Sequence, residues 1–392
     1  MKQIGTAATL YRGGTSKALF VRRADLPFPV GHHALASWIR AAYGSPDRRQ
    51  IDGIGGADLT TSKFVVVGPP TRDDADVDYS FFQVGIDNAI IATDLNCGNI
   101  SAAVVPFAVD AGLLELADGQ STVTIHNTND GKLFYATVEV TDGVVQLGGD
   151  FENEGVPGTG FPIALDFRDS VGGRTGELLP TGSVRDTFTV DGLGEVDCTV
   201  VDIANLIVFA PASAFGLTGT EDPATIANDA KLLRHVELLR GAVATKLGFA
   251  ASPEDAATSS PGTPFVSLVA PAATWAAFGT GQIRHADECD LLARGFTMGL
   301  VHKAYWGTGS ICTGVAAVLP GSVVHEVTNH RAADSGRVRI GHPSGVVEVQ
   351  VDVNPTTLAV TRGALLRTAR KIMDGTVYVP ADKIAESLPV AV

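Results

Sequence analysis

The chain has 392 residues, with 29 Lys and Arg against 43 Asp and Glu, which gives a net charge of −14. No cluster of basic residues interleaved with aromatic residues interrupts this acidic background, so nucleic acid is excluded as an expected partner. Hydrophobic residues make up 45% of the chain, and single cores usually stop growing near about 250–300 residues, so we expect two domains.

The hydrophobic pattern predicts an α+β protein with more strands than helices. The clearest helix begins at Asp222-Pro223 and carries apolar residues at three- and four-residue spacing. In chain order, we expect a helix over 33–43, strands over 63–67 and 77–84, a helix over 97–112, a strand over 134–140, helices over 222–247 and 285–304, a strand over 346–353 and a helix over 361–373.

The segment Asn96-Cys97-Gly98-Asn99 places a thiol directly before an apolar run of small residues, 100–105. This run is typical of the buried start of a helix, so Cys97 is expected at the N-terminal end of that helix. Free N–H groups and the positive dipole end would favour a thiolate and a bound carboxylate there. A catalytic cysteine and a buried structural cysteine both stay open as interpretations, because most free cysteines are structural.

An internal similarity links the two halves of the sequence. His126 follows Cys97 by 29 residues, and His342 follows Cys312 by 30 residues; a predicted strand comes after each histidine. We expect two similar halves that face each other across one cleft, with a thiol at a helix start in each. Chance similarity between Gly-rich strand–turn segments is the alternative.

The cysteines also bear on the class of protein. Cys97, Cys198, Cys289 and Cys312 have neither CxxC nor His/Cys metal-ligand spacing, which argues against a disulfide framework and a zinc site. The N-terminus lacks a signal-peptide apolar region, and no window holds 18 uninterrupted apolar residues. We therefore expect a soluble, cytoplasmic protein without a membrane partner.

A series of motifs resembles the ordered signature of the PrpF family, which includes 2-methylaconitate and methylitaconate isomerases, aconitate Δ-isomerases and oxalomesaconate tautomerases. The resemblance runs from about residue 8 to residue 380. Its motifs are Tyr11–Lys17, Gln50–Gly56, Thr61–Lys63, Asp76–Tyr79, Asn96–Asn99, Gly341–Gly345 and Arg367–Gly375.

The resemblance implies a diaminopimelate-epimerase-like fold. Two pseudo-symmetric α+β domains would each wrap a sheet around a central helix, with the active site in the cleft between them. We place the domains at 1–185 and 186–392, with the last strand able to return to the first domain. The resemblance also implies chemistry without a metal or an organic cofactor, and we expect a homodimer.

Within the family the catalytic pair is a lysine and a cysteine, which map to Lys63 and Cys97, 34 residues apart. Moving a carbon–carbon double bond in an unsaturated polycarboxylate requires removal of one proton and delivery of another two carbons away. A partly buried amine and a thiol suit these transfers. Which group acts first stays open, and a solvated lysine beside a strand is the structural alternative for Lys63.

The remaining motifs are suited to binding the carboxylates of a small-molecule substrate. They offer backbone N–H groups without bulky side chains, together with hydroxyl donors, as anion-binding nests do. Arg12 and Lys17 are candidate charge partners, or else surface ion-pair residues. The candidate binding residues are Gly14, Thr15, Ser16, Lys17, Thr61, Ser62, Asn96, Gly98, Asn99, Ser310, Thr313, Gly314, His342, Ser344 and Gly345.

Other functions are weighed against this one. A racemase or epimerase of the same fold would oppose Cys97 with a second thiol, but aligning the two helix starts places Ile311, not Cys312, opposite Cys97. A dehydrogenase would rest on Gly53–Gly56, which lacks the GxGxxG pattern.

A cysteine hydrolase would need His126 or His342 near Cys97, and a non-catalytic accessory or binding protein is the last alternative. The particular polycarboxylate is left open.

Overall fold

The computed structural model of the protein describes residues 2–385, and its contacts divide the chain into two compact units. Unit 1 comprises the chain up to Leu165 together with the segment from Arg367 onward, and unit 2 comprises Asp166–Leu366. The sequence placed one boundary at 185/186 instead. Residues 166–185 pack with unit 2 because the side chain of Asp202 accepts the backbone N–H groups of Arg174 and Thr175. Residues 386–392 of the expected second domain lie outside the described residues.

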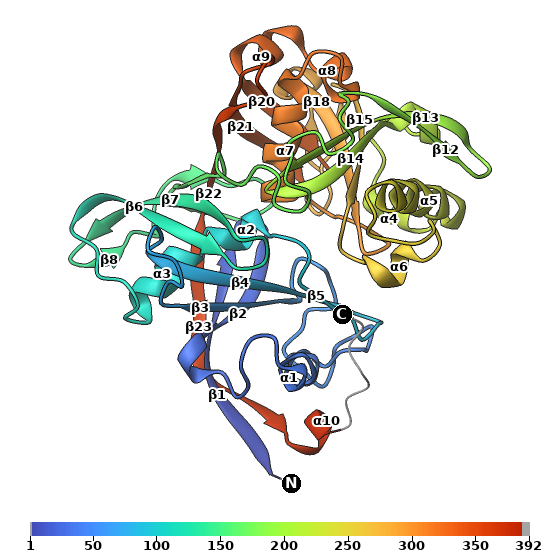
Figure 1. Cartoon of the computed structure of the whole chain (residues 1–392). Helices are drawn as coiled ribbons and strands as arrows, with labels where there is room; N and C mark the ends of the chain where they lie inside the picture. Colours follow the sequence, from blue (N-terminus) through green and yellow to red (C-terminus); the bar gives the residue numbers. More distant parts are fainter. Residues whose placement is uncertain (1, 386–392) are drawn as a thin grey trace. The chain divides into compact units, whose positions relative to one another are not determined.

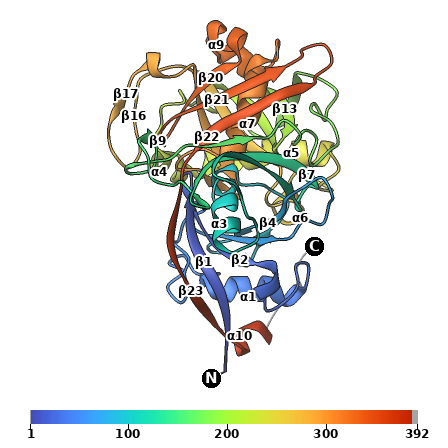
Figure 2. The ribbon, with the colours of Figure 1, turned by 90° about the vertical axis from the view of Figure 1, so that its left-hand side faces the viewer.

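Unit 1 is built on a mixed sheet (Figure 1). Its strands are β1 (Gln3–Gly13), β2 (Ser16–Arg22), β3 (Lys63–Gly68), β4 (Val77–Val84), β5 (Ile91–Ala92), β6 (Gly119–Asn127), β7 (Lys132–Thr141), β8 (Val144–Val145) and β23 (Ala369–Pro380). The parallel pairings are β2 with β3 and β4 with β6. The antiparallel pairings include β23 with β1, β1 with β2, β3 with β4, and β6 with β7. Figure 2 shows β1 and β23, from opposite ends of the chain, running side by side.

One face of this sheet is covered by α1 (His33–Tyr43), and the sequence predicted a helix with these bounds. The helix begins where Nδ1 of His32 accepts the N–H of Ala34, and it ends at Gly44, whose left-handed φ of 71° suits glycine. Trp38 of α1 is fully buried and packs edge-on against Phe64 of β3, with ring centroids 5.7 Å apart. This helix and the alternate strand residues that it covers form one core of unit 1.

The opposite face carries α2 (Gly98–Ser101) and α3 (Val104–Asp110) in place of the single predicted helix over 97–112. Phe107 of α3 packs against Tyr11 and Phe20 of the sheet. The prediction of one continuous helix was wrong, because the chain turns between the two short segments. Cys97 therefore precedes a helix of only four residues, which has a much smaller dipole than the sequence suggested.

Unit 2 repeats the topology of unit 1. Its main strands are β12 (Asp186–Val190), β13 (Gly194–Ile203), β14 (Asn205–Pro211), β15 (Phe265–Pro271), β18 (Leu291–Thr297), β19 (Leu300–Val301), β20 (Arg337–His342), β21 (Gly345–Val353) and β22 (Val360–Arg367). The series β13-β14-β15-β18-β20-β21 has the same alternation of antiparallel and parallel pairings as β1-β2-β3-β4-β6-β7. The two halves are thus similar in fold, as predicted.

The central helix of unit 2 is α7 (Gly307–Val318), which is buried on all sides from Gly307 to Ala317. A helix without a polar face belongs inside a protein, and here the sheet of the unit surrounds it. The other helices are α4 (Pro223–Ala227), α5 (Ala230–Lys246), α6 (Ala256–Ser259), α8 (Val323–Val327), α9 (His330–Ser335) and, in unit 1, α10 (Asp382–Ala385).

Several sequence expectations about helices were wrong. The predicted helix over 285–304 is mainly the strands β18 and β19, because β18 is held in the sheet between β15 and β20. The predicted helix over 361–373 is the end of β22 and the start of β23. The predicted helix over 222–247 is interrupted at Asn228–Asp229, where the Asp229 carboxylate caps α5 by accepting the N–H of Leu232.

The remaining short segments are β9 (Phe151–Glu152), β10 (Thr159–Gly160), β11 (Ile163–Asp166), β16 (Trp275–Ala276), β17 (Ile283–Arg284), and the 3-10 turns η1 (Arg23–Asp25), η2 (Ala212–Phe215) and η3 (Ala286–Glu288).

Candidate active site

Lys63 is a buried lysine at the start of β3, only 5% exposed. Its Nζ donates to Oε1 of Gln83, its antiparallel neighbour on β4, at 2.5 Å. The ammonium also lies 5.2 Å from the centre of the Phe81 ring, within the range of a cation–π contact. Among the described residues, no carboxylate forms an ion pair with Lys63, which is unusual for a buried lysine.

Strand alternation sorts the neighbouring candidates between the two faces of the sheet. Ala18 is paired with Lys63 across β2 and β3, so Lys63 shares its face with Ala18 and, two residues earlier, with Ser16. This is the face covered by α2 and α3. Lys17 and Ser62 alternate to the α1 face; the Ser62 hydroxyl donates to Gln50 at 2.7 Å.

Thr61, next to Ser62, is also tied down within unit 1, since its hydroxyl donates to the carbonyl of Asp58 at 3.2 Å. The backbone N–H of Lys17 donates to the Thr60 carbonyl at 2.8 Å. Lys17 and Ser62 therefore point away from the face that carries Lys63, whereas the binding role of Thr61 stays a prediction.

Cys97 precedes α2 and is 7% exposed. Its carbonyl accepts both the N–H and the hydroxyl of Ser101, which closes the first turn of α2. Burial raises the pKa of the Tyr79 phenol well above its ordinary value, and the charge of Cys97 raises it further, so the thiol lies near this β4 residue. Tyr79, Phe81 and Gln83 are two residues apart on β4, so their side chains lie on one face, the face of Lys63. Cys97 is therefore beside the face that carries Lys63.

The β1–β2 turn lies directly against Asn99. Nδ2 of Asn99 donates to Oγ1 of Thr15 at 3.1 Å. Gly14 has a φ of 50°, and a Cβ on it would come within 2.5 Å of Asn99 Oδ1. The close approach therefore requires glycine. Gly14, Thr15, Gly98 and Asn99 form one cluster in unit 1.

Asn96 is held by the turn that follows β6. Its Nδ2 donates to Oδ2 of Asp130 at 2.6 Å, and its Oδ1 accepts from Nδ2 of Asn127. Asn129 in the same turn donates to the carbonyls of Phe81 and Thr93, at 2.8 and 2.9 Å. The turn thus fixes the segment that leads into Cys97, and Asn96 is one of the residues through which it does so.

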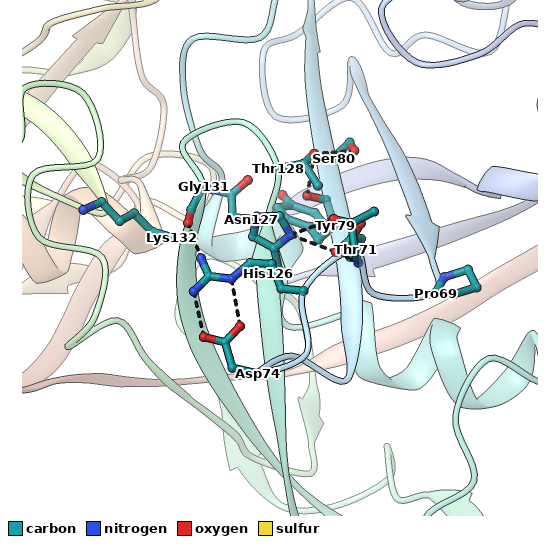
Figure 3. A network of polar contacts seen from close by, with 12 residues as sticks. Pro69, Thr71, Asp74, Tyr79, Ser80, His126, Asn127, Thr128, Gly131 and Lys132 are labelled. Atoms are coloured by element: carbon teal, nitrogen blue, oxygen red, sulfur yellow. Dashed lines mark hydrogen bonds and ion pairs between the residues drawn. The ribbon is translucent and has the colours of Figure 1, made fainter.

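A separate polar network surrounds His126 at the end of β6 (Figure 3). Nδ1 of His126 lies 2.8 Å from Oδ1 of Asp78 and 3.4 Å from Oγ1 of Thr71, and Asp78 also accepts from Arg23 at 2.8 Å. Burial tends to raise the pKa of Asp78, but the hydrogen bonds from His126, Thr71 and Arg23 outweigh it and lower the pKa. His126 is thereby engaged in a structural ion network, which disfavours a hydrolase base role.

In unit 2, the candidate residues of α7 make internal contacts. Oγ of Ser310 donates to the Trp306 carbonyl and Oγ1 of Thr313 to the Gly309 carbonyl, both at 2.7 Å. A Cβ on Gly314 would lie 2.6 Å from a Val349 methyl, so this glycine allows close helix–sheet packing. The internal similarity placed Cys312 at the start of a helix, but the residue lies inside α7 and is fully buried. Its Sγ donates to the Val201 carbonyl at 3.4 Å.

The second Gly-rich turn, between β20 and β21, is also tightly bonded within unit 2. Nδ1 of His342 accepts the N–H of Ser344 at 3.2 Å, and the Ser344 hydroxyl donates to the Lys303 carbonyl at 2.6 Å. Gly345 has a φ of 149°, in the region that favours glycine. The binding roles of these residues and of those on α7 stay predictions.

Within residues 2–385, no group of three or more His, Cys, Asp and Glu side chains is placed to hold a metal ion. In the same part of the chain, every helix is too short or too polar to span a membrane.

Comparisons with known proteins place the chain in a family. The family model described as "PrpF protein" matches residues 3–380. The chain is 43% identical over 382 residues to 3-methylitaconate isomerase of Eubacterium barkeri, covering 97% of this chain and 99% of that protein. It is 37% identical over 391 residues to 2-methyl-aconitate isomerase of Shewanella oneidensis, covering 96% and 98%.

Solved structures agree with this result. The crystal structure of methylitaconate-delta-isomerase matches with a TM-score of 0.78 at 42% identity, covering 99% of this chain and 98% of that one. A hydroxyproline epimerase from Agrobacterium vitis matches in fold alone, with a TM-score of 0.56 at 13% identity and coverage of 98% and 96%. The fold is the predicted α+β, diaminopimelate-epimerase-like one. The chain belongs to the PrpF family and is an isomerase.

Sequence reasoning missed residues that contact Lys63 or the turn that begins at Cys97. Gln83 and Phe81 contact Lys63, but only the pairing of β3 with β4 reveals this. Arg367 donates through Nε to Oδ1 of Asn99 at 2.9 Å. Arg367 is the first residue of the family motif Arg367–Gly375, and this motif could have indicated it. The incorrect prediction of a helix over 361–373 gave no reason to place it near Asn99.

We expect iodoacetamide to label Cys97 faster than the other cysteines, by at least about tenfold at neutral pH. Burial raises the pKa of Cys289 to about 11 and raises the pKa of Cys198 and Cys312 further, so less of each is thiolate. These three residues are also at most 2% exposed, against 7% for Cys97. Peptide mass spectrometry after timed labelling measures the four rates, and similar rates at all four thiols would contradict the expectation.

Proposed function

We propose that the protein is an allylic isomerase that moves a carbon–carbon double bond in an unsaturated di- or tricarboxylate by a 1,3-proton shift. Candidate substrates are 2-methylaconitate, aconitate, methylitaconate and oxalomesaconate. The proposal includes chemistry without a metal or an organic cofactor. Its supports are the PrpF family membership, the activities named for the relatives, and the surroundings of Lys63 and Cys97.

The observation that carries the proposal is the environment of Lys63. Burying a lysine without a carboxylate partner costs free energy. Such a residue is therefore expected where the amine has a function. Here the Nζ donates to the neutral amide of Gln83 and lies beside the Phe81 ring. Cys97, the residue before α2, is on the same face of the sheet. Such an amine can exchange a proton with a substrate without a neighbouring carboxylate competing for it.

The reaction then uses two proton transfers. A base removes a proton from the carbon next to the double bond, and the electron pair of that C–H bond spreads over the allylic system and the adjacent carboxylate as a dienolate. An acid delivers a proton to the carbon two positions away, and the double bond re-forms in its new place. Lys63 and Cys97 supply these two groups, each typically worth ~10²–10⁴ in rate.

The substrate carboxylates need hydrogen-bond donors on the same face. The Ser16 hydroxyl is buried and has no hydrogen-bond partner among the described residues, although a buried hydroxyl normally has one. Ser16 shares the face of Lys63 and adjoins Thr15 and Gly14 in the turn against Asn99. A substrate carboxylate would satisfy this hydroxyl and would hold charge that builds up in the dienolate.

The burial of Cys312 disfavours the two-thiol epimerase mechanism. Its thiol is fully buried, it donates to a backbone carbonyl of the neighbouring strand β13, and burial raises its pKa well above the ordinary value. A cysteine in this state holds its proton. It is suited to packing rather than to proton exchange with a substrate.

Incubation with each candidate substrate in deuterated water tests the proposal. With a chelator present, proton NMR should show the double bond moving in at least one of them and solvent deuterium appearing at the carbon that receives the proton. Deuterium exchange at a single saturated carbon, with the double bond unmoved, would favour a racemase. Loss of activity on chelation would count against the metal-free mechanism.

A further inference from the structure

Arg367 is a buried arginine bonded to the turn that contains Cys97. The residue is 7% exposed, and its Nε donates to Oδ1 of Asn99 at 2.9 Å. The guanidinium has donors only, so the bond fixes which end of the Asn99 amide is the oxygen. The Nδ2 end therefore faces Thr15, to which it donates at 3.1 Å.

The neighbouring residue extends this connection to the β1–β2 turn. The Thr368 carbonyl accepts the N–H of Gly14 at 2.9 Å and Nη1 of Arg12 at 2.9 Å. Arg12 Nη1 also lies 3.0 Å from the Gly14 carbonyl. Three segments far apart in sequence, 12–15, 97–99 and 367–368, are thus joined by directional bonds inside unit 1.

The same guanidinium interacts with the thiol electrostatically. Burial lowers the pKa of Arg367 to about 10, and the charge of Cys97 acts in the opposite direction. At neutral pH Arg367 remains protonated. Its positive charge lies against the turn that begins at Cys97, because the guanidinium is bonded to Asn99, two residues further along the chain.

We propose that Arg367 is the positioning residue of Cys97: it anchors the Cys97–Gly98–Asn99 turn through the Asn99 amide and places a buried positive charge against that turn. The inference rests on the proposed role of Cys97 in proton transfer. It explains why a buried cation is retained next to a small-residue turn. It also assigns Asn99 to the support of that turn, bonded on both sides of its amide.

Two substitutions separate the charge from the geometry. Arg367→Met removes both, so we expect alkylation of Cys97 by iodoacetamide at neutral pH to slow about tenfold and kcat to fall about tenfold or more, with KM little changed. Arg367→Lys keeps a positive charge but not the planar donor group. It should leave Cys97 alkylation within about twofold of the native rate while kcat still falls.

Arg294 offers a matched control in unit 2. It too is fully buried, burial lowers its pKa to about 10, and its Nε donates to the Glu221 carbonyl at 3.0 Å. Arg294→Met in the folded protein should leave Cys97 alkylation and kcat unchanged. Native alkylation and native kcat in Arg367→Met would overturn the inference.

Should Arg367→Met fail to fold, Arg367→Lys decides: a native kcat there would overturn the inference. Cys97→Ser distinguishes the two proposals. Full activity in Cys97→Ser would remove the proposed function, whereas the alkylation rate of Cys97 in the Arg367 variants would still test the charge assigned to Arg367.

Discussion

Lys63→Met and Cys97→Ser are each expected to lower kcat by at least ~10²-fold, because each removes a group that transfers a proton in the transition state. Methionine fills the space of the lysine chain without a titratable group, and serine keeps the size of the cysteine with a far less acidic hydrogen. Steady-state kinetics with the substrate identified by NMR measures the effect.

The control for this pair is substrate binding by the folded variants. Calorimetric titration should give a dissociation constant within about tenfold of the native one, because the proposed carboxylate donors are left in place. If either variant retained more than a tenth of the native kcat, the corresponding residue would lose its proton-transfer role.

Trp38→Ala is expected to lower the free energy of unfolding by about 3–5 kcal/mol, through lost burial and a cavity between α1 and the sheet. Trp38 is fully buried against Phe64 on the face opposite Lys63. The folded variant should therefore keep its kcat. Urea unfolding followed by circular dichroism gives the loss.

Tyr378→Ala is the matched aromatic control in the same unit. Tyr378 is 61% exposed on β23, so its removal should change the free energy of unfolding by less than about 1 kcal/mol. A loss below 1 kcal/mol in Trp38→Ala, or a similar loss in both variants, would contradict the packing described for α1.

The parts of the fold that the sequence predicted well are those with strong local signals. The helix over 33–43 has one apolar face and a glycine at its end, and the strand beginning at Lys63 is a run of β-branched residues. The order of the motifs then indicated the family. Local pattern and global fold agree at these positions.

The errors occur where partners distant in sequence decide the structure. The segment 361–373 has apolar residues at helical spacing, but β23 pairs with β1 along the whole of β1, and sheet pairing prevails. Residues 285–304 likewise lie in the sheet because β15 and β20 flank β18. No window of the sequence contains this information.

The candidate site divides in the same way. Lys63, Cys97 and Asn99 could be proposed from family motifs, whereas their partners Gln83 and Arg367 depend on strand register and on a segment 268 residues away from Asn99. Lys17 was proposed beside Ser16, but alternation along β2 sends the two side chains to opposite faces.

The comparison of Cys312→Ser with Lys63→Met tests the central claim most directly. Serine is nearly isosteric with cysteine, and its hydroxyl can keep donating to the Val201 carbonyl, so the fold should be preserved. An allylic isomerase that uses Lys63 and Cys97 predicts near-native kcat for Cys312→Ser and loss of activity for Lys63→Met. If Cys312→Ser were as damaging as Cys97→Ser while Lys63→Met stayed active, a two-thiol epimerase mechanism would replace the one proposed.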